Sequence, residues 1–453
     1  MAAREHFGGR VAVVMAMAGS AIGLGNIWRF PYVLGQNGGA AFLLVYVLSC
    51  FLLALPIFCS ETVIGRRSRA NTFGAMEKLA PGTPWKWLGL LTIISPLLIL
   101  SYYSVVGGWS VEYFAKSLSF DFDSVNPLAA EGFFDRFISS TWKPVLTHTV
   151  FLGITAGIVL FGVKKGIERF SKWTIPALFV LIVAILVYSL SLPGSGSGVE
   201  YLFHPDFSKL GAQGVSAAMG QAFFSMSLGV GTILTYASYV KKEEDLVKSG
   251  FGTALFDLGF ALLAGFAVMP AVFAAGLAPQ EGPSLVFQTL PFIFTKMGSS
   301  SPWLGALVSI IFFLSILVAA LTSSISMMEV GVAYLVEEKK MKRTTATLAI
   351  TAFTWALGVL CSLSLGVLGE YRILGLSIFD FLDRLCSNWL LPAGGLLFTL
   401  FVGWKMKKAD VWDEITNSGT IPLACKFFPV IYFLIRFVAP VGIFIVFISP
   451  LLF

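Results

Sequence analysis

Eleven apolar runs, each long enough to cross a bilayer, constrain this chain more than any other feature. A membrane-spanning helix needs roughly 20 mostly apolar residues, and such runs recur along the whole sequence. With 57% apolar and 12% charged residues, the composition fits neither a soluble nor a disordered class. We therefore expect an all-α polytopic membrane protein with eleven transmembrane helices. The predicted ranges are 10–34, 40–64, 88–115, 144–163, 173–192, 213–240, 250–276, 302–335, 345–368, 373–404 and 428–452.

The basic residues predict how these helices cross the membrane. If the N-terminus is cytoplasmic, basic clusters at 66–69, 164–165, 241–242 and 339–343 all fall on the cytoplasmic side, as the positive-inside rule requires. An odd number of crossings then places the C-terminus outside the cell. We interpret the net charge of +6 as a result of this topology and expect no nucleic-acid partner. The chain is predicted to be a multi-pass protein of the cell membrane, and the sequence does not indicate its oligomeric state.

The first run, residues 10–36, has poor helix formers at its centre. Gly19, Gly23 and Gly25 lie there together with Ser20 and Asn26. Each interior glycine costs about 1 kcal/mol relative to alanine, and unpaired backbone at membrane depth is tolerated only where it lines a cavity or is buried in protein. Free carbonyls there can hold a small cation, and free amides can hold a carboxylate. Close packing of helices through small residues is the alternative that this run leaves open.

The sixth run, residues 213–240, contains a similar break. Ser225, Ser227, Gly229 and Gly231 lie at its centre. Each broken run opens a block of five, and an odd number of crossings makes the two blocks start on opposite sides of the membrane, which indicates an inverted repeat. We expect the first repeat in residues 1–193, an extracellular loop in 194–211, the second repeat in 212–404, and a cytoplasmic segment with helix eleven in 405–453.

Polar groups inside other runs mark candidate sites. Adjacent hydroxyls at Thr322 and Ser323, with nearby carbonyls, form a set of oxygen atoms suited to a cation, although such hydroxyls also bond to the preceding helical turn. Asp257 lies within an apolar run, so its carboxyl group must be protonated, meet a cation or form a structural hydrogen bond. The ionisable residues within the predicted helices are Glu61, Glu112, Asp257, Glu329, Asp380, Asp383 and Arg436.

The sequence contains no motif for enzymatic chemistry. HExxH, GxSxG and P-loop patterns do not occur, and the three histidines are dispersed. The five cysteines lie in or beside the apolar runs without CxxC spacing, so we expect them to be packing residues. We therefore expect a membrane protein that is not an enzyme.

Three segments carry a family resemblance. AGSAIGLGNIWRFP in the first run, FFSMSLGVGTILTYASY in the sixth and LTSSIS in the eighth resemble the neurotransmitter:sodium symporter family, and most of all its bacterial amino-acid transporters with eleven helices. The resemblance implies a LeuT-type fold of two inverted five-helix repeats. It also implies that helices 1 and 6 are unwound at mid-membrane, where the substrate and two sodium ions bind.

The resemblance further implies the ligands of the two sodium ions. The first ion would bind the substrate carboxylate and the carbonyl or side-chain oxygens of Ala21, Asn26, Ser225 and Asp257. The second would bind the carbonyls of Gly19, Ile22 and Ala319 and the hydroxyls of Thr322 and Ser323. Because Asp257 supplies a fixed negative charge beside the first ion, no chloride requirement is expected.

A substrate pocket follows from the same resemblance. Its implied residues are Ala21, Gly23, Leu24, Gly25, Ile99, Tyr103, Phe224, Ser225, Ser227, Val230, Ser323 and Met327. Monoamine transporters of the family carry an aspartate where this sequence has Gly23, so an amino acid is expected. The apolar side-chain pocket predicts a sodium-coupled symporter that imports hydrophobic L-amino acids by alternating access. The alternatives are a transporter of a small amino acid or osmolyte, and a non-transporting channel or sensor on the same fold.

Two gates are also implied. Arg29 and Asp383 match the family's outer charge pair, and Arg4, Tyr239 and Glu337 match its inner network. Pro176 cannot donate a backbone hydrogen bond, so span five is open to unwinding between Gly166 and Pro176, although a tight turn at Gly166 explains the sequence equally well.

Overall fold

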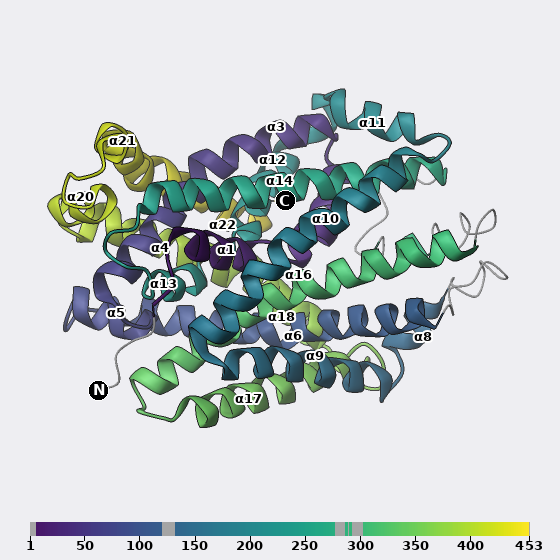
Figure 1. Cartoon of the computed structure of the whole chain (residues 1–453), viewed down its shortest axis with the longest axis horizontal. Helices are drawn as coiled ribbons and strands as arrows, with labels where there is room; N and C mark the ends of the chain where they lie inside the picture. The colour runs from purple at the N-terminus through teal and green to yellow at the C-terminus, as the bar shows by residue number, and fades with distance from the viewer. Residues whose placement is uncertain (1–5, 120–131, 277–285, 289, 292–301, 453) are drawn as a thin grey trace.

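The protein is described by a computed structural model that covers residues 6–119, 132–276, 286–288, 290–291 and 302–452. Within these ranges the chain is almost entirely helical and contains no β-strand, so the all-α expectation is confirmed. The helices lie roughly side by side along the long axis of the molecule (Figure 1).

The first half of the chain forms the helices up to α10. Their bounds are α1 (Arg10–Ala21), η1 (Gly25–Arg29), α2 (Phe30–Gln36), α3 (Ala40–Ser49), η2 (Cys50–Ala54), α4 (Leu55–Ser68), α5 (Thr72–Leu79), α6 (Lys86–Leu118), α8 (Phe133–Ile138), α9 (Lys143–Leu160), η3 (Val163–Glu168) and α10 (Arg169–Leu190). Elements named η are short π-helical turns that continue a neighbouring α-helix.

The second half begins with a short helix outside the predicted spans. Its bounds are α11 (Ser195–Phe203), α12 (Phe207–Ser225), α13 (Thr232–Ala237), α14 (Leu246–Ala274), α16 (Pro302–Glu337), α17 (Arg343–Leu363), α18 (Ile378–Leu385), η5 (Cys386–Leu390), α19 (Leu391–Leu400), η6 (Phe401–Lys405), α20 (Lys408–Thr416), α21 (Pro422–Phe433), η7 (Leu434–Val438) and α22 (Ala439–Leu452).

The number of membrane crossings differs from the simple expectation. In the described ranges, nine helices are long and apolar enough to span a bilayer, and the bent pair α1 and η1–α2 makes a tenth. The predicted sixth span is present as two pieces, α12 and α13, and α13 has only 6 residues. The count of eleven is therefore not confirmed by helix length and composition, because α13 is too short and the 19-residue α12, with its lysine, glutamines and serines, does not have a sufficiently apolar stretch.

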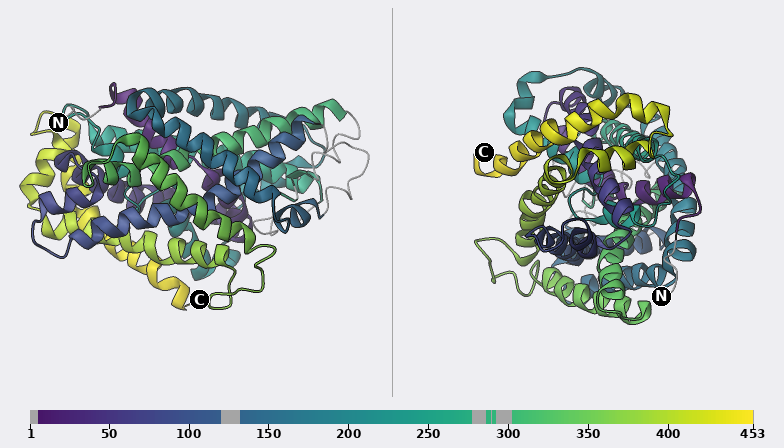
Figure 2. Two further views of the ribbon diagram at one scale, coloured as in Figure 1. Left: turned by 90° about the horizontal axis from the view of Figure 1, so that it is seen from below. Right: turned by 90° about the vertical axis from the view of Figure 1, so that its left-hand side faces the viewer.

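The long helix α16 lies at the centre of the bundle. It packs against α6, α9, α10 and α17, and it also contacts α1 and α13. Two perpendicular views show the helices enclosing the middle of the molecule (Figure 2). Because α16 touches both broken spans, it can bring its own polar residues to the two breaks.

Span five is helical in this structure. The π-helical turn η3 leads directly into α10, and Pro176 lies inside α10 without a break. Gly166 packs against the backbone carbonyl of Ile158 in α9, where a side chain would collide. The close approach of two helices therefore accounts for Gly166 here. All five cysteines are free, and Cys50, Cys59, Cys361 and Cys386 are buried.

A network of ion pairs joins α4, the segment after α13 and α20 at the end of the bundle where the N-terminus lies (Figure 1). Buried Arg66 pairs with Glu414 at 2.8 Å and donates to the carbonyl of Glu244 at 2.6 Å. Lys242 pairs with Asp413 at 2.8 Å. Burial alone would lower the pKa of Lys242, but its hydrogen bonds to Asp413 and Glu414 raise it above the usual value. Hydrogen bonds from Lys242 and Ser418 lower the pKa of Asp413.

Candidate functional site

Span one is broken where its glycines predicted. Helix α1 ends at Ala21, and the next residue, Ile22, is extended with φ −70° and ψ 111°. The chain becomes helical again at Gly25, and the two halves are bent by 55°. Ile22 and Gly23 therefore lie outside regular helix at a buried position, so the unwinding expected for this span is confirmed.

Span six is broken in the predicted place as well. Helix α12 ends at Ser225, and α13 begins at Thr232. Between them Ser227, Gly229 and Gly231 have positive φ values of 52°, 82° and 71°. That left-handed conformation suits glycine and is uncommon for serine. The strained serine is held because its hydroxyl donates to the carbonyl of Ser20 at 2.7 Å, which joins the two breaks directly.

Glu61 of α4 supports the second break, a role that the sequence did not reveal. Its carboxylate accepts hydrogen bonds from the amides of Gly229 at 2.7 Å and Leu234 at 3.3 Å. The Gly229 amide lies in the break and the Leu234 amide in the first turn of α13, so both would otherwise be unpaired in a buried region. The sequence showed only that Glu61 is an ionisable residue within a span, and such residues are functional by default. It did not show which groups Glu61 would contact.

A small cavity lies between the two breaks. Its volume is about 40 Å³, and all twelve residues predicted for the substrate pocket line it. The thirteenth lining residue, Leu391 of α19, was not predicted. The carbonyl of Leu391 and the amide of Gly395 lie against Gly229 so closely that a side chain there would collide with both. Span ten thus forms one wall of the cavity by direct contact with the unwound part of span six.

One end of the cavity offers hydrogen-bond donors. The amide of Leu24 lies 3.2 Å from the hydroxyl oxygen of Tyr103. At Gly23 a Cβ atom would lie 3.0 Å from the Tyr103 hydroxyl and closer still to Ser323. The Leu24 amide, just before η1, and the Tyr103 hydroxyl pair with each other in this structure, and both are donors suited to a carboxylate. Gly23 is therefore the residue that leaves space for such a group.

The residues expected to hold a first cation meet beside the cavity. Asn26 Nδ2 lies 2.7 Å from Asp257 Oδ1 and 2.9 Å from Ser225 Oγ, and Ser225 Oγ lies 2.8 Å from both carboxylate oxygens of Asp257. All three side chains are buried. The Asn26 carbonyl oxygen accepts from the amide of Gly23 at 3.0 Å. This set combines one carboxylate with neutral oxygens, which suits a monovalent cation.

The residues expected to hold a second cation also converge. The Thr322 hydroxyl lies 3.1 Å from the carbonyl of Ile22 and 2.8 Å from that of Ala319. The Ser323 hydroxyl lies 3.2 Å from the carbonyl of Ser20. Each hydroxyl here donates to a carbonyl, but both groups present oxygen lone pairs that a hard cation can take. With only neutral oxygens, the set fits an ion of low charge.

Two further members of the cation sets have less definite positions. Ala21 lines the cavity, and its carbonyl forms no hydrogen bond outside α1 that the structure records. Gly19 faces α10, where a Cβ atom would lie 3.2 Å from the hydroxyl of Ser171. Their roles as ligands remain predictions.

A larger cavity of about 500 Å³ lies outside the small one. The two cavities share four lining residues, Leu24, Gly25, Tyr103 and Phe224. The Arg29 guanidinium lies 4.7 Å from the centre of the Phe224 ring. Arg29 and Asp383 both line the larger cavity, but no ion pair within 4.0 Å joins these two described residues. Arg29 and Asp383, the predicted outer pair, therefore line the same cavity but do not form an ion pair in this structure.

The opposite side of the site is closed by a buried network. Tyr239 donates to Glu329 at 2.9 Å, and Arg343 pairs with the same carboxylate at 2.5 Å. The predicted Glu337 accepts from the backbone amide of Asn71 at 2.7 Å. Arg4 lies outside the described residues. Glu329 and Arg343 were not assigned to this gate from the sequence, because only their packing across spans eight and nine brings them to Tyr239.

Comparisons with known proteins agree over nearly the whole chain. The model of the Sodium:neurotransmitter symporter family matches residues 4–126 and 135–452. The sodium-dependent transporter YhdH of Bacillus subtilis is 39% identical over 442 residues, covering 97% of this chain and 96% of that protein. A sodium-dependent transporter of Haemophilus influenzae is 34% identical, covering 99% of this chain and 98% of its own. The crystal structure of MhsT in complex with L-phenylalanine superposes with a TM-score of 0.90 at 43% identity, covering 99% of this chain and 100% of MhsT.

Proposed function

This chain belongs to the sodium:neurotransmitter symporter family of sodium-dependent, multi-pass membrane transporters, and we propose that it imports hydrophobic L-amino acids together with sodium. The family resemblance and the LeuT-type fold expected from the sequence are confirmed, and the protein is a transporter, not an enzyme. The observation that carries the proposal is the meeting of two unwound helices at one small cavity with a set of cation-binding oxygens on each side.

An amino acid fits the polar end of the site better than an amine. Gly23 contributes no carboxylate, and a side chain there would collide with Ser323. The substrate's own carboxylate would therefore occupy the space beside the Leu24 amide and the Tyr103 hydroxyl. Carbonyls of the unwound segment after Ser225 would receive the ammonium group. MhsT, which is similar over its whole length, has been crystallised with L-phenylalanine.

The other end of the cavity favours an apolar side chain. Its walls include Ile99, Val230, Met327 and Leu391, all buried. A water molecule needs about 10–15 Å³ of such volume, so a cavity of 40 Å³ holds about three waters. This volume is smaller than the volume that a leucine or phenylalanine side chain requires. Binding of a large substrate would thus move the walls, and Met327 is the most adaptable of them.

Two sodium ions would travel with the substrate. Asn26, Ser225, Asp257 and the carbonyl of Ala21 would hold the first, in contact with the substrate carboxylate. The second would be held by the set around Thr322 and Ser323, together with the carbonyls of Gly19, Ile22 and Ala319. Because residues 21–26 would supply groups to the substrate and to both ions, binding of one ligand would order the backbone that the others need. That shared segment couples the three.

Alternating access would use the closures on either side of the cavity. On the outer side Tyr103 and Phe224 separate the small cavity from the larger one, and Arg29 and Asp383 would come together when the outer side closes. When the inner side opens, the Glu329–Arg343 pair would break. The contacts of Tyr239, Glu337 and Arg4 would break at the same time. The proposed orientation keeps the N-terminus in the cytoplasm and the C-terminus outside, with residues 1–193 and 212–404 as the inverted repeats.

A second candidate function follows from the cavity's volume. A cavity of about 40 Å³ would need to open less for a small amino acid such as glycine or alanine than for leucine or phenylalanine. A channel or sensor is less well supported, since in the described residues Tyr103 and Phe224 on one side and the Tyr239–Glu329–Arg343 network on the other close the small cavity.

Binding by purified protein in sodium separates these candidates. Competition of labelled leucine by glycine, alanine, valine, phenylalanine and tryptophan is measured, with potassium replacing sodium as the control. We expect phenylalanine and tryptophan to compete at least tenfold better than glycine, and binding to vanish in potassium. Preference for glycine or alanine would support the small-substrate alternative.

A further inference from the structure

Arg436 of span eleven is held against the end of span ten by close backbone contact. Gly403 allows this, because a Cβ atom there would lie only 2.9 Å from the Cα atom of Arg436. The indole N–H of Trp404 donates to the carbonyl of Arg436 at 3.0 Å, and the hydroxyl of Tyr432 donates to the carbonyl of Gly403 at 3.2 Å. The position of Arg436 is therefore fixed by both helices.

The charge of this arginine is not neutralised by the protein. Its guanidinium carbon lies 4.4 Å from the centre of the Trp404 ring and 5.5 Å from that of Phe437. The Nε atom is buried without a hydrogen-bond partner, and in the described parts of the chain no carboxylate comes within 4.0 Å of the guanidinium. Cation–π contacts stabilise such a group, but they provide no counter-charge.

The surroundings of Arg436 face lipid. Trp404 and Phe437 are 56% and 44% exposed, and both belong to helices that are long and apolar enough to span the bilayer. Trp404 is next to the last residue of its span, Lys405, which is exposed. Tryptophan and lysine at a helix end are typical of the membrane–water interface. Because Arg436 contacts Gly403 and Trp404 at this end of span ten, its guanidinium is placed near the lipid headgroups.

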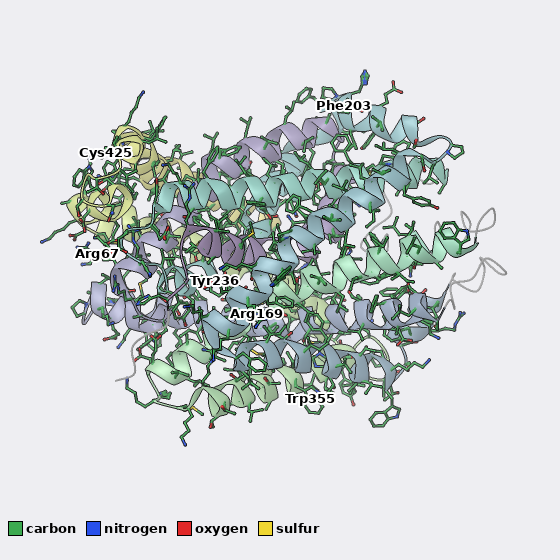
Figure 3. The ribbon with its side chains drawn as sticks, in the orientation of Figure 1. Arg67, Arg169, Phe203, Tyr236, Trp355 and Cys425 are labelled. Atoms are coloured by element: carbon green, nitrogen blue, oxygen red, sulfur yellow. The ribbon has the colours of Figure 1, made fainter. Side chains whose placement is uncertain are left out.

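Further positive charge lies at the same end of these helices. Lys408 Nζ is 5.5 Å from the centre of the Tyr432 ring, one turn before Arg436 in the sequence. The nearest acidic residue along α20, Asp410, is already paired with Arg67 at 2.6 Å. Arg67 and Cys425 of α21 lie at this same end of the molecule in Figure 3. The local excess of positive charge is thus available to an external anion.

We propose that Arg436, with Trp404 beside it, forms a binding site for the phosphate of an anionic phospholipid. The planar guanidinium pairs with phosphate oxygens through two parallel hydrogen bonds, and basic pockets between transmembrane helices are suited to anionic headgroups. The acyl chains would lie along the exposed apolar surface beside the site, at Phe433 and Phe437. A free phosphate ion would gain only the polar half of these contacts.

The test measures lipid binding to purified protein without any transport assay. Native mass spectrometry counts bound lipid, and the melting temperature is recorded, during titration with phosphatidylglycerol, phosphatidylcholine or glycerol phosphate. The variants are R436Q, R436K and, as matched control, R169Q, which removes an exposed arginine of α10 that lies away from α20 and α21 (Figure 3).

We expect phosphatidylglycerol to bind wild-type protein as a discrete adduct and to raise its melting temperature. R436Q should weaken that binding at least tenfold and R436K at least threefold, while R169Q leaves it unchanged. Should R436Q fail to fold, R436K alone tests the guanidinium. The proposal is overturned if R436Q or R436K binds like the wild type, if R169Q weakens binding equally, if phosphatidylcholine binds as tightly, or if glycerol phosphate reproduces the effect.

Discussion

Replacing Asp257 by asparagine tests the first sodium site with the smallest change of shape. The substitution keeps one oxygen and the size of the side chain but removes the buried negative charge that Asn26 and Ser225 surround. Two unit charges about 4 Å apart interact by roughly 4 kcal/mol at an effective dielectric of about 20. Since about 1.4 kcal/mol corresponds to a tenfold change, the upper limit is a loss of about three orders of magnitude in sodium affinity.

The assay is binding of labelled leucine to purified protein over a sodium titration, in chloride or in gluconate. We expect D257N to need at least tenfold more sodium for half-maximal binding, and we expect chloride to restore part of the loss. Wild-type binding should not change when gluconate replaces chloride. Glu112, partly exposed on α6, provides the control E112Q. Unchanged sodium affinity in D257N, or a chloride requirement in the wild type, would refute the reasoning.

Three other substitutions test the remaining walls of the site. T322V removes the hydroxyl that now bonds to Ile22, so sodium-driven uptake should fall at least tenfold while expression is retained; an unchanged sodium dependence would remove Thr322 from the second site. G23D places a carboxylate where the substrate's own would lie, so leucine binding should be lost; retained binding would show that the pocket lies elsewhere. L391A enlarges the small cavity and should raise the preference for tryptophan over valine severalfold. Leu390 does not line the cavity, so an equal change in L390A would show that Leu391 does not set the size of the substrate pocket.

The two helix breaks could be predicted because their causes are local. Glycines and hydroxyl residues at the centre of an apolar run disfavour continuous helix wherever the chain folds, and both breaks lie where those residues are. The family motifs then predicted which side chains face the break, and the same twelve line one cavity. Their ligand roles stay predictions until substrate and sodium binding are measured.

The supporting residues could not be predicted because their roles depend on contacts between distant segments. Glu61 of α4 accepts a hydrogen bond from Gly229 in the break of span six, and Leu391 of α19 lines the cavity. Glu329 and Arg343 meet Tyr239 only after three spans pack together. Arg29 and Asp383 are a different case, since a pair that forms the proposed outer gate would come together only when the outer side closes.

Uptake into liposomes tests the central claim, that sodium and a hydrophobic amino acid move together, most directly. Purified protein is reconstituted into vesicles, and labelled leucine is followed with sodium or potassium outside and with increasing external sodium. We predict accumulation of leucine above its external concentration only with an inward sodium gradient, and a Hill coefficient for sodium above one, because two ions are proposed. Equal uptake with potassium, or leucine that merely equilibrates across the membrane, would contradict the account.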